Sequence, residues 1–369
     1  MEQLVNGKKR VAVLFGGQST EHEVSLLSSI NIIQEIDRQK YDLTLIGVDK
    51  QGRWMLFDEH NYLINADNPA AICLAPKSHF LAMVPGYNQT QFINISTGKE
   101  LPAIDVVFSV LHGACGEDGS VQGLLRVLNI PFVGPDVLGS AICMDKDMTK
   151  RVLRDAGVLV TPSITLLRND LTVIDFDSIV ALLGLPLFIK PANQGSSVGL
   201  SKVTGRTGFE QALMLAFNHN PKVLVEQAIT GREIETAVLG NSDPEVSVCG
   251  EIFTNKEFYA YNTKYLKDSQ ARLIIPAQLD PSLAEKIRRT ARQAYLALNC
   301  SVMARIDFFL TDDGRILLNE VNTLPGFTSI SMYPKLWKSC NLDYPALMDR
   351  LIMLAMERSA HKTEQNQLP

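Results

Sequence analysis

The chain has 369 residues, of which 46% are hydrophobic and 20% are charged. This composition is typical of globular proteins and excludes collagen, coiled coils and intrinsically disordered chains, while the length predicts two or three domains. The formal net charge of −5 argues against non-specific nucleic-acid binding and against an anionic lipid surface as a partner.

The sequence lacks the signals of a membrane or secreted protein. Its longest uncharged apolar stretch, residues 178–189, is shorter than the roughly 20 residues of a spanning helix and contains Pro186. The first apolar run, residues 11–15, is typical of a strand and not of a signal peptide. The six cysteines form no CxxC pair, so we expect free thiols in a reducing compartment. A cytoplasmic protein without membrane or nucleic-acid partners is therefore expected.

The first part of the chain alternates strand and helix signals. Strands are predicted at 10–15, 41–48 and 106–111, and helices at 26–36 and 119–128. Such alternation predicts a parallel sheet with ligands at the carboxyl ends of its strands. The polar stretch 58–102, rich in asparagine and proline, breaks the pattern. We expect it to form an elaboration at one edge of this domain.

The later part of the chain predicts two further units, separated by Thr230-Gly231. We therefore expect an α/β chain of three domains, residues 1–134, 135–230 and 231–369. The later signals are a helix at 145–154, strands near 158 and 187, a helix at 209–217, strands at 223–227, 233–239 and 245–253, and a helix at 281–298. A hairpin and a terminal helix follow, and residues after Arg358 are expected to form a disordered tail.

The predicted hairpin, residues 304–322, is the most informative passage. Two apolar strands flank Asp313-Gly314, which is the strongest short signal for a two-residue turn. With that turn, Asp312 faces Arg315, and strand alternation then fixes which side chains share a face. One face would pair Asp307 with Glu320 and Arg305 with Asn322, and the other would pair Ile306 with Val321, Phe308 with Asn319 and Leu310 with Leu317.

The polar face of this hairpin has two interpretations. Carboxylates opposite each other, here Asp307 and Glu320, repel unless a cation neutralises them. Together with Asn322 they offer hard oxygen ligands, which suit Mg²⁺ or Mn²⁺ and not zinc. Alternatively, the face is solvated and Arg305 pairs with one of the acids. Because a magnesium ion held by few carboxylates usually also binds phosphates, the metal interpretation calls for a nucleotide site.

A glycine- and serine-rich loop is the candidate for that site. No Walker A motif is present, so the chain is not a P-loop protein. Residues 190–199, Lys-Pro-Ala-Asn-Gln-Gly-Ser-Ser-Val-Gly, place a lysine at the end of a strand before small residues whose N–H groups and hydroxyls could wrap phosphate oxygens. An ordinary connecting loop is the alternative.

Taken together, these motifs resemble those of ATP-grasp ligases and, more narrowly, of the D-alanine–D-alanine ligase family. They run in family order over residues 10–350. The matching residues are 15–25, which include Gly16-Gly17 and Glu21, then Leu111-His112-Gly113, Gly116-Glu117-Asp118-Gly119, Met144-Asp145-Lys146, 190–199, Lys264-Tyr265, Arg305-Ile306-Asp307, Glu320-Val321-Asn322 and Pro325-Gly326-Phe327-Thr328-Ser329.

The resemblance implies both a fold and a reaction. The fold would be ATP-grasp, with a Rossmann-like N-terminal domain and two further domains that hold the nucleotide. In this family ATP phosphorylates the carboxylate of one D-alanine, and the amine of a second attacks the acyl phosphate. The products are D-alanyl-D-alanine, ADP and phosphate, and the dipeptide serves the synthesis of peptidoglycan precursors.

The resemblance also assigns residues to the metal and the nucleotide. Asp307, Glu320 and Asn322 would hold two Mg²⁺ or Mn²⁺ ions. Lys146 and Lys190 would contact the phosphates, residues 226–229 the adenine and Glu233 the ribose. The full ATP set is Lys146, Lys190, Ser196, Ser197, Glu226, Gln227, Ala228, Ile229, Glu233, Lys264 and Asn319. The sequence departs from some members at Gln227 and Gln194, where they carry lysine and glutamate.

A third set would bind D-alanine. By resemblance, Glu21 receives the ammonium group of the first substrate and forms a hydrogen-bonded set with Ser196 and Tyr265, although a glutamate in the first turn of a helix is also favoured by the helix dipole. Arg305 and the Gly326 N–H would stabilise the intermediates. His112 would line the first-substrate pocket, and Ser331 would contact the carboxylate of the second substrate.

The resemblance further implies a lid and a partner. The irregular stretch 253–275 would close over the substrates, with Lys264 near the γ-phosphate, since an exposed acyl phosphate hydrolyses. Tyr265 favours a dipeptide product over a depsipeptide. A homodimer built largely through the first domain is implied as well.

Two alternatives remain open on the sequence, and a third fails. One is a related ligase with another amino acid, such as a D-alanine–D-serine or depsipeptide ligase. Another is a nucleotide-binding regulator without catalysis, against which the complete set of site residues argues. A dinucleotide-binding dehydrogenase fails because Gly16-Gly17-Gln18-Ser19 lacks the GxGxxG spacing.

Overall fold

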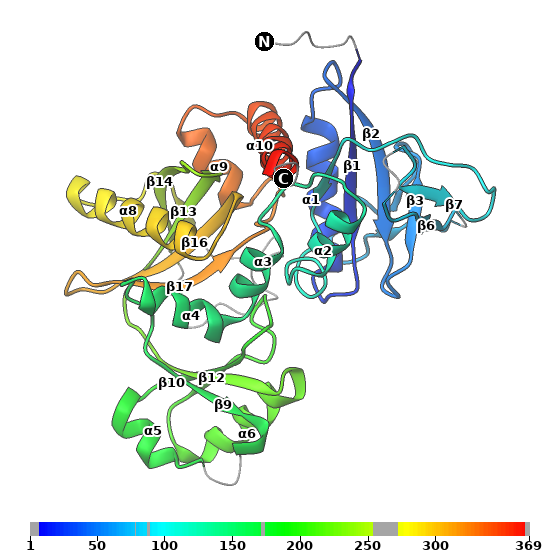
Figure 1. Cartoon of the computed structure of the whole chain (residues 1–369). Coiled ribbons are helices and arrows are strands. Elements are labelled where there is room, and N and C mark those ends of the chain that lie inside the picture. The colour runs from blue at the N-terminus through cyan, green and yellow to red at the C-terminus, as the bar shows by residue number, and fades with distance from the viewer. Residues whose placement is uncertain (1–6, 78, 87–88, 171–173, 254–271, 366–369) are drawn as a thin grey trace.

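The computed structural model describes residues 7–77, 79–86, 89–170, 174–253 and 272–365. Three larger sheets follow one another along the chain, as Figure 1 shows. The first sheet, with its helices, lies on one side of the molecule, the third lies on the other, and the second extends away from the third. The domain boundaries predicted at residues 134 and 230 fall between sheets and stay a prediction. Within the described ranges, no helix is long and apolar enough to cross a membrane.

The first sheet has the strand order β3-β2-β1-β8. Its strands β1 (Lys9–Gly16), β2 (Tyr41–Val48) and β8 (Val106–Ser109) are parallel, which confirms the prediction, and β3 (Trp54–Phe57) lies antiparallel at the edge. Helices α1 (His22–Glu35) and α2 (Ser120–Val127) follow β1 and β8. The carboxyl ends of β1 and β8 therefore open side by side, where a ligand is expected.

The stretch 58–102 is an elaboration at the β3 edge, as predicted. It contains two small hairpins, β4 (Leu63–Ile64) with β5 (Cys73–Leu74) and β6 (Leu81–Met83) with β7 (Phe92–Asn94). A bridge between Met55 and Phe80 attaches the second hairpin to the sheet. The hairpins thus cover an edge strand that would otherwise expose unpaired backbone groups.

The second sheet is antiparallel, with the order β11-β10-β12-β9. Its strands are β9 (Ser163–Leu167), β10 (Leu187–Pro191), β11 (Ser201–Val203) and β12 (Lys222–Gln227). Helices α5 (Phe176–Leu183) and α6 (Arg206–His219) share one apolar core with it, and a 3₁₀ turn η1 (Arg168–Asp170) follows β9. The strand predicted near residue 158 was wrong: Val160 makes only an isolated bridge to Leu318, and the strand begins at Ser163.

The third sheet is antiparallel, with the order β15-β14-β13-β16-β17. Its strands are β13 (Arg232–Gly240), β14 (Glu245–Phe253), β15 (Arg272–Ile274), β16 (Val302–Leu310) and β17 (Ile316–Asn322), and its helices are α3 (Val137–Met144), α4 (Lys146–Asp155), α8 (Pro281–Ala297), α9 (Met332–Ser339) and α10 (Tyr344–Gln365). One apolar core joins α9 and α10 to the first sheet, so the first and third sheets are packed as one body. The tail predicted after Arg358 was wrong, because α10 continues to Gln365.

The turn between β16 and β17 differs from the prediction. Thr311 N donates to Arg315 O at 3.0 Å, and Gly314 N donates to Thr311 O at 2.9 Å. The loop is therefore Asp312-Asp313-Gly314, three residues instead of two, and Gly314 adopts the positive φ that such loops require. The pairing expected for Phe308 with Asn319 was wrong, since Phe308 lies opposite Leu318.

A bulge then restores the predicted register at the polar end of the hairpin. Asn319 is the extra residue on β17, so Asp307 lies opposite Glu320 and Arg305 opposite Asn322, as predicted. Between the turn and the bulge the three-residue loop shifts the register by one, so the expected pairing of Leu310 with Leu317 was wrong and Leu310 lies opposite Ile316. The longer turn and the bulge cancel before the strands reach the site.

Candidate active site

Two cavities meet where the three sheets converge. The first encloses about 780 Å³, partly open to solvent, between the carboxyl ends of the first sheet and the segment after β17. The second encloses about 1330 Å³ between the second and third sheets, also partly open. Lys146, Gly195, Ser196 and Glu320 line both cavities. A molecule in one cavity would therefore lie against a molecule in the other.

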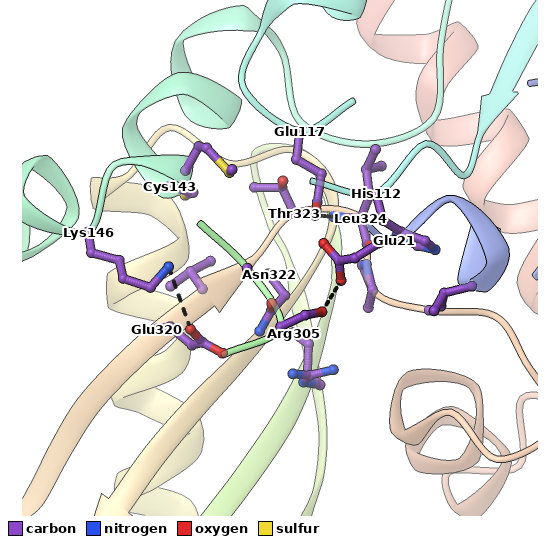
Figure 2. Close-up of a pocket in the computed structure, with 17 residues that line it drawn as sticks. Glu21, His112, Glu117, Cys143, Lys146, Arg305, Glu320, Asn322, Thr323 and Leu324 are labelled. Carbon is purple, nitrogen blue, oxygen red and sulfur yellow. Dashed lines mark hydrogen bonds and ion pairs between the residues drawn. The ribbon is translucent and has the colours of Figure 1, made fainter. Parts of the chain in front are cut away.

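The predicted residues divide between these cavities. The first is lined by the expected D-alanine residues Glu21, His112, Ser196, Arg305 and Gly326, with Glu320 and Asn322 (Figure 2). The second is lined by the expected nucleotide residues Lys146, Lys190, Ser196, Ser197, Glu226, Gln227, Ile229, Glu233 and Asn319, with Asp307 and Glu320. Ala228 and Ser331 line neither cavity, although the Ser331 hydroxyl lies beside Gly326. Lys264, Tyr265 and most of the predicted lid lie outside the described residues.

Glu21 reaches the first cavity from the turn between β1 and α1. It is the N-cap residue of α1, but its side chain makes no capping hydrogen bond. Its carboxylate instead accepts a hydrogen bond from the Ser196 hydroxyl. A Cβ atom at Gly113 or Gly195 would lie 2.9 or 3.0 Å from Glu21 Oε2, so two glycines make room for this carboxylate. The side chain of Glu21 therefore does not cap α1 and instead contacts the loop after β10.

The loop after β10 has strained backbone at the junction of the cavities. Ser196 and Ser197 have φ angles of +50° and +61°, in the left-handed region that serine seldom occupies. Such residues cost about 1–3 kcal/mol each and cluster at functional sites. The Lys146 ammonium group donates to the carbonyl of Gln194 at 2.8 Å and so holds the loop from the side of α4.

Glu117 is a half-buried carboxylate within the motif Gly116-Glu117-Asp118-Gly119, and no role was predicted for it from the sequence. It accepts hydrogen bonds from Gly113 N at 2.7 Å and from Leu324 N at 3.1 Å. Burial, followed by the charge of Glu21, raises the pKa of Glu117 to about 8. His112 Nδ1 donates to the carbonyl of Leu324 at 3.0 Å, and burial lowers the pKa of this imidazole. The backbone N–H and C=O of Leu324 are thus both hydrogen-bonded to side chains of the segment that follows β8.

A row of carboxylates crosses the third sheet at the site. Glu235 on β13 lies opposite Asp307 on β16, which lies opposite Glu320 on β17. The Arg305 guanidinium pairs bidentately with Asp307 at 2.8 and 2.7 Å, and its Nε lies 3.0 Å from Glu235. Glu235 was not predicted from the sequence. Its signal was two acids, Glu233 and Glu235, at strand spacing within an apolar run.

Buried charges also surround the far end of the second cavity. The Glu226 carboxylate lies 2.7 Å from Lys190 Nζ and 3.0 Å from Lys150 Nζ. Burial lowers the pKa of Lys150, a residue missed in the sequence, to about 8. Burial acts to raise the pKa of Glu226, but Lys150 and Lys190 hold it below its ordinary value. Glu226 is therefore an ionised group, fixed in place beside the predicted adenine position.

The geometry combines three chemical capacities. The first cavity offers Glu21 to an ammonium group and Arg305 to an anion. The second offers lysines and a glycine-serine loop to phosphates. Carboxylates at their junction suit a hard cation. Together these groups suit phosphoryl transfer from a nucleotide in one cavity to a small amino acid in the other.

The comparisons with known proteins agree on one family. The sequence matches the family models described as D-ala D-ala ligase N-terminus, over residues 10–135, and D-ala D-ala ligase C-terminus, over residues 152–353. It is 71% identical over 364 residues, 99% of this chain and 100% of the relative, to the D-alanine–D-alanine ligase of Sodalis glossinidius.

Two solved structures resemble the fold over nearly its whole length. The D-alanine–D-alanine ligase of Coxiella burnetii superposes with a TM-score of 0.85 at 36% identity, covering 98% of this chain and 97% of that one. The VanG D-Ala:D-Ser ligase of Enterococcus faecalis superposes with a TM-score of 0.83 at 37% identity, covering 95% and 100%. The expected ATP-grasp fold is confirmed. The chain belongs to the D-alanine–D-alanine ligase family.

Proposed function

We propose that this chain joins two molecules of D-alanine into D-alanyl-D-alanine, with conversion of ATP to ADP and phosphate, for bacterial peptidoglycan synthesis. The observation that carries the proposal is the meeting of the two cavities at Ser196 and Glu320. There a carboxylate bound in the first cavity faces the terminal phosphate of a nucleotide bound in the second. The family membership and the names of the relatives point to the same reaction.

We propose roles for the site residues that the positions of Glu21, Ser196 and Arg305 in the first cavity support. A carboxylate is a poor acyl donor, and phosphorylation supplies a leaving group. Glu21 receives the ammonium group of the first D-alanine, and the hydrogen bond from Ser196 fixes the Glu21 carboxylate. Arg305 lies on the opposite side of the cavity (Figure 2), where negative charge develops on the acyl phosphate and the tetrahedral intermediate. The Gly326 N–H adds to this stabilisation, and Ser331 binds the second substrate.

The nucleotide is proposed to occupy the second cavity. Lys146 and Lys190 contact its phosphates together with Ser196, Ser197 and Asn319. Residues 226–229 contact the adenine, and Glu233 contacts the ribose. All of these residues except Ala228 line the cavity, which supports the assignment. The proposed roles of Lys264 and Tyr265 lie outside the described residues and rest on the resemblance.

Asp307, Glu320 and Asn322 are proposed to hold two Mg²⁺ or Mn²⁺ ions. The donors fit, because Asp307 faces Glu320 across two strands and these carboxylates, with the Asn322 amide, offer the hard oxygen ligands that such ions prefer. Facing carboxylates also need a positive charge nearby. Arg305 and Lys146 meet that need in this structure, at 2.7 Å from Asp307 and 4.0 Å from Glu320. No cluster of three His, Cys, Asp or Glu side chains suited to a metal occurs among the described residues. That suits ions completed by substrate phosphates, whose charge they would neutralise.

The location and assembly of the protein are also proposals. We propose a cytoplasmic enzyme, where ATP is available, and a homodimer formed largely through the first domain. Val127 of α2, in the first domain, is 59% exposed, which supports an apolar contact there. Light scattering of the wild type and of Val127→Asp tests this: a dimer that the variant splits is expected, and a wild-type monomer would refute it.

Phosphate release tests the reaction. We would incubate the protein with ATP and Mg²⁺ and with D-alanine, L-alanine or no amino acid, and identify products by mass. D-alanine-dependent phosphate with the dipeptide is expected. Ser196→Ala should lower the rate roughly 10- to 100-fold, since a hydrogen bond to a charged group contributes about 1.5–3 kcal/mol. Ser178→Ala, on the exposed first turn of α5, is the matched control. ATP binding without turnover would favour the regulator.

A D-alanine–D-serine ligase is the second candidate. The structural similarity to the VanG D-Ala:D-Ser ligase supports it, since 37% identity is as high as that to the Coxiella enzyme. Competition between D-alanine, D-serine and D-lactate as acceptors separates the candidates. We expect D-alanyl-D-alanine to dominate, and an excess of the mixed dipeptide at equal acceptor concentrations would contradict the proposal. Tyr265→Phe is predicted to relax discrimination against D-lactate, and unchanged product ratios would refute that role.

A further inference from the structure

The guanidinium of Arg305 lies between two carboxylates on neighbouring strands. Asp307 accepts two hydrogen bonds from it, at 2.8 Å from Nε and 2.7 Å from Nη2. Glu235, only 6% exposed, places Oε2 at 3.0 Å from the same Nε. Burial opposes the charge of Arg305, but Asp307 and Glu235 raise its pKa well above the ordinary value. The arginine is thus ionised in a half-buried position.

Asp307 cannot serve Arg305 and a cation equally well. Both of its oxygens already accept hydrogen bonds from Arg305, and Oδ2 also accepts one from Asn322 Nδ2 at 2.9 Å. These three bonds occupy most of the roughly four lone-pair sites of the carboxylate, and a divalent ion at Asp307 would also repel the guanidinium. Arg305 must then loosen its contact with Asp307 while keeping a counter-charge, because a shielded charge without a partner is costly.

We propose that Glu235 is a positioning residue that retains the Arg305 guanidinium when Asp307 binds a divalent cation. Glu235 lies directly opposite Asp307 across β13 and β16, so a small shift carries the guanidinium from one carboxylate to the other. The exchange frees Asp307 for the cation and leaves Arg305 at the wall of the first cavity. This inference rests on the proposed function, because it assumes a cation at Asp307.

A purely structural role for Glu235 gives different expectations. A structural residue would only hold β13 against β16, and glutamine could make much of that contact. A negative charge directly opposite Asp307 is instead unfavourable for the sheet by itself. Loss of that charge would leave Arg305 more firmly paired with Asp307, so the arginine would compete with the cation. Cation affinity is therefore the property that distinguishes the two roles.

The test measures Mn²⁺ binding by electron paramagnetic resonance, without substrates, for the wild type, Glu235→Gln and Glu251→Gln. Glu251 is the matched control because it is a buried glutamate on the adjacent β14 that pairs bidentately with Arg232, at 2.8 and 2.7 Å. E235Q should raise the Kd for Mn²⁺ roughly tenfold, which corresponds to about 1.4 kcal/mol. E251Q should leave it within about twofold, although both variants lose stability.

A double variant makes the test decisive. If Arg305 competes for Asp307 in E235Q, then E235Q/R305M should recover the wild-type affinity for Mn²⁺ even though its catalysis is lost. Should E235Q fail to fold, Glu235→Asp replaces it, because the shorter side chain keeps the charge but lengthens the contact to Arg305. Unchanged Mn²⁺ affinity in the folded variant, or weakened affinity that R305M does not restore, overturns the inference.

Activity assays separate this inference from the proposed function. The Mg²⁺ concentration that gives half-maximal phosphate release should rise in E235Q, with a smaller change in the rate at saturating Mg²⁺. A wild type that releases no D-alanine-dependent phosphate, but whose Mn²⁺ affinity still depends on Glu235, would refute the function and keep the inference. An active wild type with a Glu235-independent Mn²⁺ affinity would refute the inference alone.

Discussion

The hydroxyl of Ser196 donates a hydrogen bond to the carboxylate of Glu21, across 175 positions of sequence. It joins the turn after β1 in the first sheet to the loop after β10 in the second. Because Ser196 also lines the second cavity, this contact connects the proposed amino-acid site to the proposed phosphate site. Substitutions that displace Glu21 or Ser196 should therefore weaken substrate binding more than they lower the stability of the fold.

Gly195→Ala is expected to raise the KM for D-alanine roughly tenfold or more. The new Cβ would lie 3.0 Å from Glu21 Oε2, so the carboxylate must shift away from its bond with Ser196. Gly195 has no positive φ, so backbone strain is not a competing cause. Steady-state kinetics with Gly205→Ala as control provide the test, since nothing lies within 4 Å of that position. Equal KM values in both variants would count against the close fit at Glu21.

Glu117→Gln is expected to change how stability depends on pH. The pKa of Glu117, about 8 against an ordinary 4.5, means that the folded protein binds this proton more tightly than the unfolded chain. Its contribution to stability is full below pH 4.5 and is lost as the pH rises through 8, by at most about 1.4 kcal/mol per pH unit. The glutamine variant cannot titrate and lacks this loss.

Urea unfolding between pH 5 and 8.5 checks the prediction for Glu117. The variant should be less stable than the wild type at pH 5, because an amide nitrogen cannot accept from Gly113 N or Leu324 N in place of an oxygen. The difference in the free energy of unfolding between the wild type and E117Q should become smaller towards pH 8. Exposed Glu285→Gln serves as the control. A constant difference between E117Q and the wild type across the range would show that Glu117 does not titrate there.

Lys150→Met is expected to lower the free energy of unfolding by about 3–5 kcal/mol, the usual cost of breaking a buried ion pair. Lys150 is 1% exposed, and its ammonium group lies 3.0 Å from Glu226 and 3.2 Å from the carbonyl of Thr161. ATP affinity should also fall, since Glu226 would draw Lys190 more strongly. Lys286→Met on the exposed face of α8 should change stability by less than about 0.5 kcal/mol. A similar small loss in K150M would refute the prediction.

Two arginines on α10 are expected to differ in their effect on stability. Arg358 is half-buried against the segment that leaves the first sheet, where it donates to Phe132 O at 2.7 Å and to Gly134 O, and its Cζ lies 4.5 Å from the centroid of the Phe132 ring. Arg350 pairs with exposed Glu245 at 2.6 Å. Arg358→Met should cost about 2–4 kcal/mol and Arg350→Met no more than about 1 kcal/mol. Urea unfolding measures both, and equal losses would contradict this assignment.

The outcome at the β16–β17 hairpin shows how a sequence prediction can be correct at the site and wrong beside it. Asp313-Gly314 favours a tight turn, but the pair is compatible with two-residue and three-residue loops. The observed loop has three residues, and the bulge at Asn319 compensates for the additional one. Neither feature has a strong local signal, because both depend on how the strands pack on α8 and α4.

The sequence by itself determined the parallel first sheet, the order of the motifs, the family and the facing pair Asp307 and Glu320. The sheet and the facing pair depend on residue periodicity and on spacing within one segment, which is local information, whereas the family follows from the resemblance of an ordered series of motifs. Only the tertiary structure showed that Glu235, Glu117 and Lys150 belong to the site. Glu235 and Lys150 are buried, Glu117 is half-buried, and each has a partner far away in sequence: Arg305 for Glu235, Leu324 for Glu117 and Glu226 for Lys150. Burial and pairing of this kind arise when separate sheets pack together, so no single segment of the sequence encodes them.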